Sequence, residues 1–181
     1  LKHAKKSLEI DGTNPNYMNV QALCHRKLDQ TEEAIAIFQK INQIHPRFYG
    51  AFYSLYETYR LVDDYPNAEK ALLRAKDIFS DQINVYLSLG KFYEQSNRAE
   101  EARDMYSEGI GNCADHLDLL VALGRVNRLL GNFEEGLQQI EKALVNYSAY
   151  QPALAERCSF HVLKGEYDEA HLLLSEFISS K

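Results

Sequence analysis

The chain has 181 residues, of which 45% are hydrophobic and 25% are charged, and its formal net charge is −6. This acidic balance argues against nucleic acid as the main partner, because binding to a phosphate backbone is driven by Lys and Arg that displace counterions. No apolar run is long enough to cross a membrane, so we expect no membrane insertion. Cys24, Cys113 and Cys158 fit neither a disulfide framework nor a zinc site, and they indicate a reducing, cytoplasmic location.

A small residue returns every 34 positions along the chain. The residues in this series are Ala34, Ala68, Ala102, Gly136 and Ala170. Self-similarity with this period indicates a stack of helical repeats. A side chain no larger than a methyl group also predicts that each helix in the series lies close against another helix.

Residues 1–14 are interpreted as the C-terminal part of a preceding repeat. Five repeats follow, at residues 15–48, 49–82, 83–116, 117–150 and 151–181, and the last of them is uncapped. Each repeat leaves apolar surface that only its neighbours can cover. We therefore expect one continuous solenoid domain.

Each repeat is predicted to contain two antiparallel helices. The fifteenth position of every repeat holds a residue type that tolerates the left-handed conformation in which helices end: Asp29, Asp63, Asn97, Gly131 and Gly165. Apolar residues on both sides of this position recur at i, i+3, i+4 and i+7, which places them on one helical face. One helix therefore ends, and a second begins, around this position in each repeat.

These residues resemble the pattern of the tetratricopeptide repeat (TPR) family. The third repeat shows it best, with Tyr86, Leu89-Gly90, Tyr93, Ala102 and Tyr106 at the family's characteristic positions. The resemblance implies an all-α, right-handed superhelical solenoid of antiparallel helix pairs. It also implies a scaffold or adaptor that binds a protein or peptide partner along a concave groove lined by the first helix of each repeat.

Tyr56 departs from this pattern, because it stands where the third and fourth repeats have Gly90 and Gly124. We expect its ring either to push the helices apart or to point its hydroxyl to water.

The resemblance also implies which side chains face a bound peptide. The positions of the groove carry Asn19, Arg26, Lys27, Tyr53, Glu57, Arg60, Lys91, Arg125 and Arg128. Basic residues predominate in this set, which favours an acidic or mixed peptide held by Arg side chains and by stacking on Tyr53. The alternative is that these are ordinary solvated charges that pair along their own helices, as Glu57 and Arg60 would at a spacing of three.

One specialised ligand of the family is not expected. The repeats that capture chaperone C-terminal tails use a carboxylate clamp of Lys, Asn and Arg, and the corresponding positions here are Asn19, Leu23, Ser54, Asn84 and Ser88. We therefore predict no binding of chaperone tails.

Catalysis is not expected either. Cys158 and His161 share a helical face, as a nucleophile and its base would, but they occupy positions where Gly90 and Tyr93 pack between helices. We predict a non-enzymatic chain without a catalytic residue, a cofactor or a metal.

Two other functions stay open. The chain could form the non-catalytic arm of a larger, transferase-type enzyme. It could also self-associate through its C-terminal helix, which keeps an apolar flank at Leu172, Leu173 and Phe177.

Overall fold

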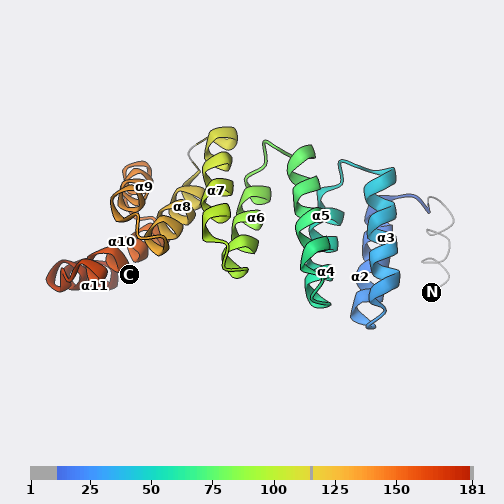
Figure 1. Cartoon of the computed structure of the whole chain (residues 1–181), viewed down its shortest axis with the longest axis horizontal. Coiled ribbons are helices and arrows are strands. Elements are labelled where there is room, and N and C mark those ends of the chain that lie inside the picture. The colour runs from blue at the N-terminus through green and yellow to red at the C-terminus, as the bar shows by residue number, and fades with distance from the viewer. Residues whose placement is uncertain (1–11, 115, 180–181) are drawn as a thin grey trace. The chain divides into compact units, whose positions relative to one another are not determined.

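A computed structural model describes residues 12–114 and 116–179, with side chains in the last helix as far as Ser175. Over these residues the regular structure is entirely helical (Figure 1). The helices belong to two compact units, which meet in sequence between Ser80 and Asp81. No helix in the described part of the chain is both long and apolar enough to span a membrane.

The first unit contains two helix pairs. Its helices are α2 (Pro15–Lys27), α3 (Thr31–Ile44), α4 (Tyr49–Leu61) and α5 (Tyr65–Ile78). Helix α3 packs on its own partner α2 and also on α4 of the next pair. Phe38, Phe52 and Leu72, from three of these helices, are almost completely buried in the core.

The second unit contains three helix pairs. Its helices are α6 (Ile83–Gln95), α7 (Ala99–Cys113), α8 (Leu117–Leu129), α9 (Phe133–Asn146), α10 (Gln151–Lys164) and α11 (Tyr167–Ser179). Helix α7 packs on α8, and α9 packs on α10. Leu120, Ile140 and Phe160 meet in a core cluster that joins α8, α9 and α10.

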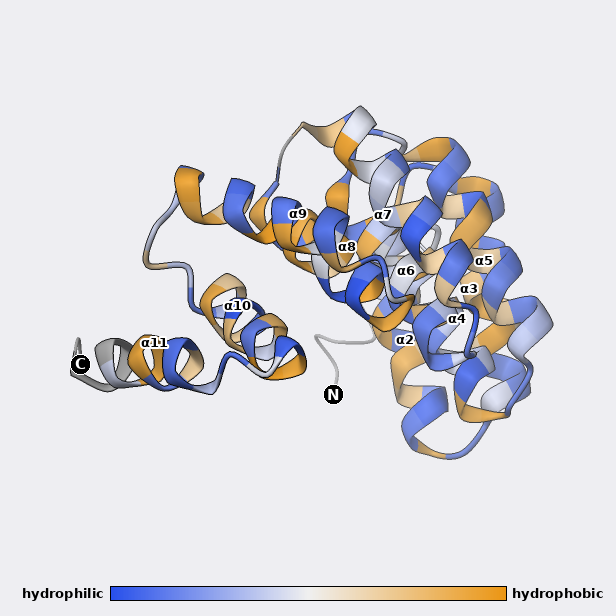
Figure 2. Ribbon diagram, turned by 60° about the vertical axis from the view of Figure 1, so that its left-hand side comes forward, coloured by the Kyte–Doolittle hydropathy of each residue, from blue (hydrophilic) through white to orange (hydrophobic). Residues whose placement is uncertain are grey.

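Hydrophobic and hydrophilic residues alternate around the helices, as amphipathic elements require (Figure 2). All five residues of the small-residue series are buried, Ala34, Ala68 and Ala102 completely. A Cβ atom on Gly136 would lie 2.7 Å from the Phe160 ring and 2.8 Å from the Gly124 carbonyl oxygen. The series therefore marks buried positions, and at Gly136 the helices approach too closely to admit a Cβ atom.

The turns inside the pairs lie where the sequence predicts them. Asp29, Asp63 and Asn97 adopt positive φ angles of 56–58°, and Gly131 and Gly165 adopt 81° and 79°. Ala114, which follows α7, also has a positive φ of 62°, and nothing in its residue type indicated this. Alanine rarely adopts such a conformation, because its Cβ crowds the backbone there.

Of the two outcomes expected for Tyr56, a hydroxyl that points to water is excluded. The residue is only 3% exposed, and its hydroxyl oxygen accepts a hydrogen bond from Nη1 of Arg60 at 3.4 Å. An arginine one turn further along α4 therefore provides a hydrogen-bond donor to this buried hydroxyl.

At the C-terminal end, Leu172 and Leu174 are exposed on α11. Leu174 is 48% exposed, whereas Phe38, Leu72, Tyr106 and Ile140, which stand at the same repeat position, are at most 1% exposed. The side chain of Phe177, the third member of the predicted flank, lies outside the described residues.

Candidate functional site

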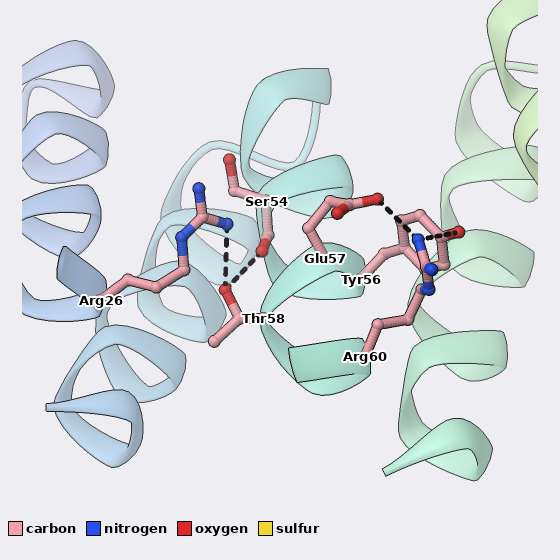
Figure 3. A network of polar contacts seen from close by, with 6 residues as sticks. All are labelled: Arg26, Ser54, Tyr56, Glu57, Thr58 and Arg60. Carbon is pink, nitrogen blue, oxygen red and sulfur yellow. Dashed lines mark hydrogen bonds and ion pairs between the residues drawn. The ribbon is translucent and has the colours of Figure 1, made fainter. Parts of the chain in front are cut away.

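The first helices of the two pairs in the first unit lie side by side and carry six of the nine predicted groove residues. We call the surface formed by α2 and α4 the first-helix face; its predicted residues are Asn19, Arg26, Lys27, Tyr53, Glu57 and Arg60. Figure 3 shows how Arg26 reaches from α2 towards α4. Its Nη1 atom donates to the Thr58 hydroxyl at 3.5 Å, and this hydroxyl donates to the Ser54 carbonyl oxygen at 2.6 Å.

Within the described residues, this arrangement leaves the charge of Arg26 without a carboxylate partner. Thr58 is neutral, and within the described part of the chain Arg26 forms no ion pair. Lys27, the next residue, is exposed at the end of α2. The two cations lie in the last turn of the helix, where the helix dipole favours positive charge. An incoming carboxylate would find both without having to displace an internal acid.

Three tyrosines form a row along α4. The Tyr53 ring lies 6.5 Å from the Tyr49 ring and 5.7 Å from the Tyr56 ring, measured between centroids. Tyr53 is 42% exposed, whereas Tyr56 is buried. Burial raises the pKa of the Tyr53 hydroxyl, and the nearby Glu57 carboxylate raises it further. Tyr53 is therefore a neutral, exposed ring on a rigid helix, which is a suitable surface for stacking.

Glu57 and Arg60 compensate each other. Nη1 of Arg60 lies 3.3 Å from Oε1 of Glu57, at the spacing of three residues expected for pairs on a helix (Figure 3). The Arg60 guanidinium carbon is also 5.6 Å from the centroid of the Tyr56 ring. These contacts match the alternative interpretation of Arg60, in which its charge pairs along its own helix.

Asn19 lies on α2 and is half-buried. Its Oδ1 atom is buried and accepts no hydrogen bond within the described residues. An acceptor without a partner weakens local packing, and we find no internal contact that explains why asparagine stands here.

In the second unit, the two predicted arginines are held by carboxylates of neighbouring first helices. Nη2 of Arg125 on α8 lies 2.9 Å from Glu94 on α6, whose carboxylate also accepts a hydrogen bond from the Tyr106 hydroxyl. Nη2 of Arg128 lies 3.1 Å from Glu156 on α10. These interhelical pairs connect consecutive repeats, so they contribute to packing inside the unit. Lys91, the third predicted groove residue here, is exposed on α6.

The structure thus divides the predicted set. Arg26 and Lys27 lie in the last turn of α2. Tyr53, Glu57 and Arg60 lie on the neighbouring helix α4. Arg125 and Arg128, by contrast, form ion pairs with carboxylates of the same unit. The sequence interpretation missed Thr58, Glu156 and the structural part played by Glu94. Glu156 stands 28 positions from Arg128, and Glu94 stands 31 from Arg125, so the two pairs share no fixed spacing that could have identified them.

Cys158 and His161 do not form an activated pair. Cys158 is buried, and burial raises the pKa of its thiol although Arg157 opposes the shift. Nδ1 of His161 lies 2.7 Å from Oε2 of Glu166, just as Nδ1 of His25 lies 2.8 Å from Oε1 of Gln30. Both histidines therefore link the end of a first helix to the start of the second. Within the described residues, no cluster of His, Cys, Asp and Glu is placed to hold a metal ion.

We predict that the cysteines differ strongly in reactivity. A raised pKa leaves less thiolate at any pH below it, and burial restricts access, so Cys158 should react with a thiol reagent at pH 8 at least tenfold more slowly than exposed Cys24. The measurement is the time course of modification with a chromogenic disulfide, in the wild type and in Cys158→Ser. Loss of the fast phase in Cys158→Ser would contradict the prediction.

Comparison with known proteins agrees with this architecture. Two segments, residues 21–47 and residues 83–116, match family models described as tetratricopeptide repeat. No curated protein sequence matches the chain significantly.

Solved structures of TPR proteins superpose on most of the chain. A tetratricopeptide repeat protein from Parabacteroides merdae has a TM-score of 0.76 and 16% identity, with 92% of this chain and 66% of that one covered. MamA has a TM-score of 0.69 and 18% identity, covering 87% and 92%. YrrB, described as a TPR protein with an unusual peptide-binding site, has a TM-score of 0.66 and 15% identity, covering 97% and 90%.

The fold defines the chain as an all-α repeat protein of the solenoid class, built from antiparallel helix pairs. Together with the two matched segments, it supports the assignment of the chain to the tetratricopeptide repeat family. The predicted resemblance to this family and the predicted all-α TPR-like fold are therefore confirmed. The chain is a protein–protein interaction scaffold in its general design, and scaffolds of this kind are generally non-catalytic.

Proposed function

We propose that the chain is a non-enzymatic adaptor that binds an extended, acidic or mixed peptide segment of a partner protein across the first-helix face. The observation that carries this proposal is the guanidinium of Arg26, which has no carboxylate partner within the described residues and donates to the neutral Thr58 hydroxyl. Tyr53 adds an exposed ring on α4. A carboxylate of the partner would bind Arg26 and Lys27, and an apolar or aromatic side chain would stack on Tyr53.

The internal ion pairs refine this proposal. Arg60, Arg125 and Arg128 already lie within 3.3 Å of carboxylate oxygens, so a ligand acid would have to compete with each of these carboxylates. We assign Arg60 a secondary role, as a partner that a ligand recruits only after it has bound Arg26, whereas Arg125 and Arg128 contribute to packing inside the second unit. Lys91 offers a further exposed cation in the second unit. The basic set as a whole favours a salt-sensitive complex.

The experiment is a pull-down from lysate on the immobilised chain at low and high salt, with bound proteins identified by mass spectrometry. The test variant is Arg26→Glu/Lys27→Glu, and the control is Lys40→Glu, which reverses an exposed cation on α3. We expect a partner that high salt removes, that the test variant loses and that the control keeps. Partners retained equally by all three proteins would overturn the proposal.

A second candidate function is self-association through the C-terminal helix. The exposure of Leu174, at a position that is buried in the four other repeats, favours it. Light scattering over a concentration series, with Leu174→Glu as the comparison, tests this candidate. A constant monomer mass for the wild type would contradict it.

A further inference from the structure

A cleft opens on the other side of the first unit, between the two second helices. Helices α3 and α5 form its walls and α4 forms its floor, and its volume is about 860 Å³. The floor consists of Phe52, Leu55 and Tyr59, each at most 9% exposed. We call this the α3–α5 cleft. None of the predicted groove residues lines it.

Ala71 accounts for part of the open space. It lines the cleft from α5 and is 4% exposed. The equivalent positions of three other repeats, at multiples of 34 residues from Ala71, carry larger side chains. These residues are Ile37, Met105 and Gln139. A methyl group therefore stands where the neighbouring repeats have long side chains, and this reduces the bulk of the α5 wall.

The α5 wall is basic, whereas the equivalent positions of α7 are acidic. Asn67, Lys70 and Arg74 line the cleft, and Lys70 and Arg74 are exposed. The residues 34 positions later, on α7, are Glu101, Asp104 and Glu108. A wall with two cations and an amide thus replaces one with three acids. Asp77 is the only carboxylate residue among those that line the cleft.

The α3 wall supplies carboxamides. Nε2 of Gln39 donates to the Tyr59 hydroxyl at 2.9 Å and so connects the wall to the floor. Asn42 and Gln43 continue this wall, and Oδ1 of Asn42 has no hydrogen-bond partner within the described residues. Carboxamides both donate and accept hydrogen bonds, which suits them to the alternating groups of an extended backbone.

We propose that the α3–α5 cleft is a second binding site, independent of the first-helix face, and that it binds an acidic peptide segment with apolar residues. Apolar side chains of the segment contact Phe52 and Leu55 on the floor. Its carboxylates pair with Lys70 and Arg74, and its backbone is hydrogen-bonded by the carboxamides of α3. The positive charge of one wall and the neutral polarity of the other select an acidic ligand over a basic one.

Fluorescence anisotropy tests the charge preference. The probes are two labelled hexapeptides, one of alternating Leu and Glu and one of alternating Leu and Gln. The wild-type chain should bind the Glu peptide at least tenfold more tightly than the Gln peptide, and Lys70→Glu/Arg74→Glu should abolish this preference. Lys40→Glu, the matched reversal on α3 outside the cleft, should keep it. Equal affinity of the wild type for the two peptides would overturn the proposal.

One further variant locates the site. Ala71→Met installs the residue that stands at position 105 and fills the cleft, so it should weaken binding of the Glu peptide at least tenfold while circular dichroism shows an unchanged fold. Undiminished binding by Ala71→Met would overturn the proposal.

Discussion

Replacement of Gly90 by Ala is expected to lower the free energy of unfolding by about 2 kcal/mol. An added Cβ would lie 2.2–2.7 Å from three carbon atoms of the Tyr106 ring, which is itself 1% exposed. The ring cannot move away easily, because its hydroxyl donates to Glu94. Overpacking of this kind costs about 1–3 kcal/mol or more, which exceeds the roughly 1 kcal/mol that Ala gains over Gly in a helix.

Gly111 provides the matched control, because a Cβ there meets nothing within 4 Å. Gly111→Ala should therefore raise the free energy of unfolding by about 0.5–1 kcal/mol through helix propensity alone. Urea denaturation of the two variants beside the wild type is the measurement. If Gly90→Ala also raised the free energy of unfolding, the close approach of α6 and α7 at Gly90 would be refuted.

Reversal of Arg128 to Glu is expected to destabilise the second unit by about 2 kcal/mol. The Arg128 and Glu156 side chains are 19% and 16% exposed, so the substitution would leave two carboxylates facing each other in a poorly solvated place. Removing one partner of a buried pair costs about 3–5 kcal/mol, and the partial exposure here reduces this figure. Arg128→Glu/Glu156→Arg should recover most of the loss.

Arg26→Glu should cost less than about 1 kcal/mol, because the only hydrogen bond it removes within the described chain is the long one to Thr58. Thermal unfolding of these three variants gives the comparison. Equal destabilisation by Arg26→Glu and Arg128→Glu would contradict our division of the basic residues into free and internally paired groups. A large loss in Arg128→Glu would also show that this residue is unsuitable for tests of ligand binding.

The fold could be predicted from the sequence because its main determinants are local and repeat. A turn needs a residue that tolerates positive φ, and the residue types of Asp29, Asn97 and Gly165 predict such turns. Close packing needs a small side chain, and the return of a small residue every 34 positions predicts where the helices pack closely. Ala114 has neither signal, although its φ is positive at the end of α7.

The site was harder to predict, because the state of each charge depends on neighbours from other repeats. The spacing of Glu57 and Arg60 indicated their pairing in advance. The partners of Arg125 and Arg128 lie on adjacent first helices, and which acid each arginine meets depends on how the helices pack. Tyr56 is similar, since the hydrogen bond that its buried hydroxyl accepts from Arg60 depends on the packing of α4 rather than on residue type.

The central claim is that the first-helix face binds the partner, and hydroxyl-radical footprinting tests it most directly. Tyr53 is 42% exposed on this face, and Tyr167, 68% exposed at the start of α11, serves as the internal reference. With the partner recovered in the pull-down, oxidation of Tyr53 should fall at least threefold while oxidation of Tyr167 stays constant. Unchanged oxidation of Tyr53 in the saturated complex would contradict the account.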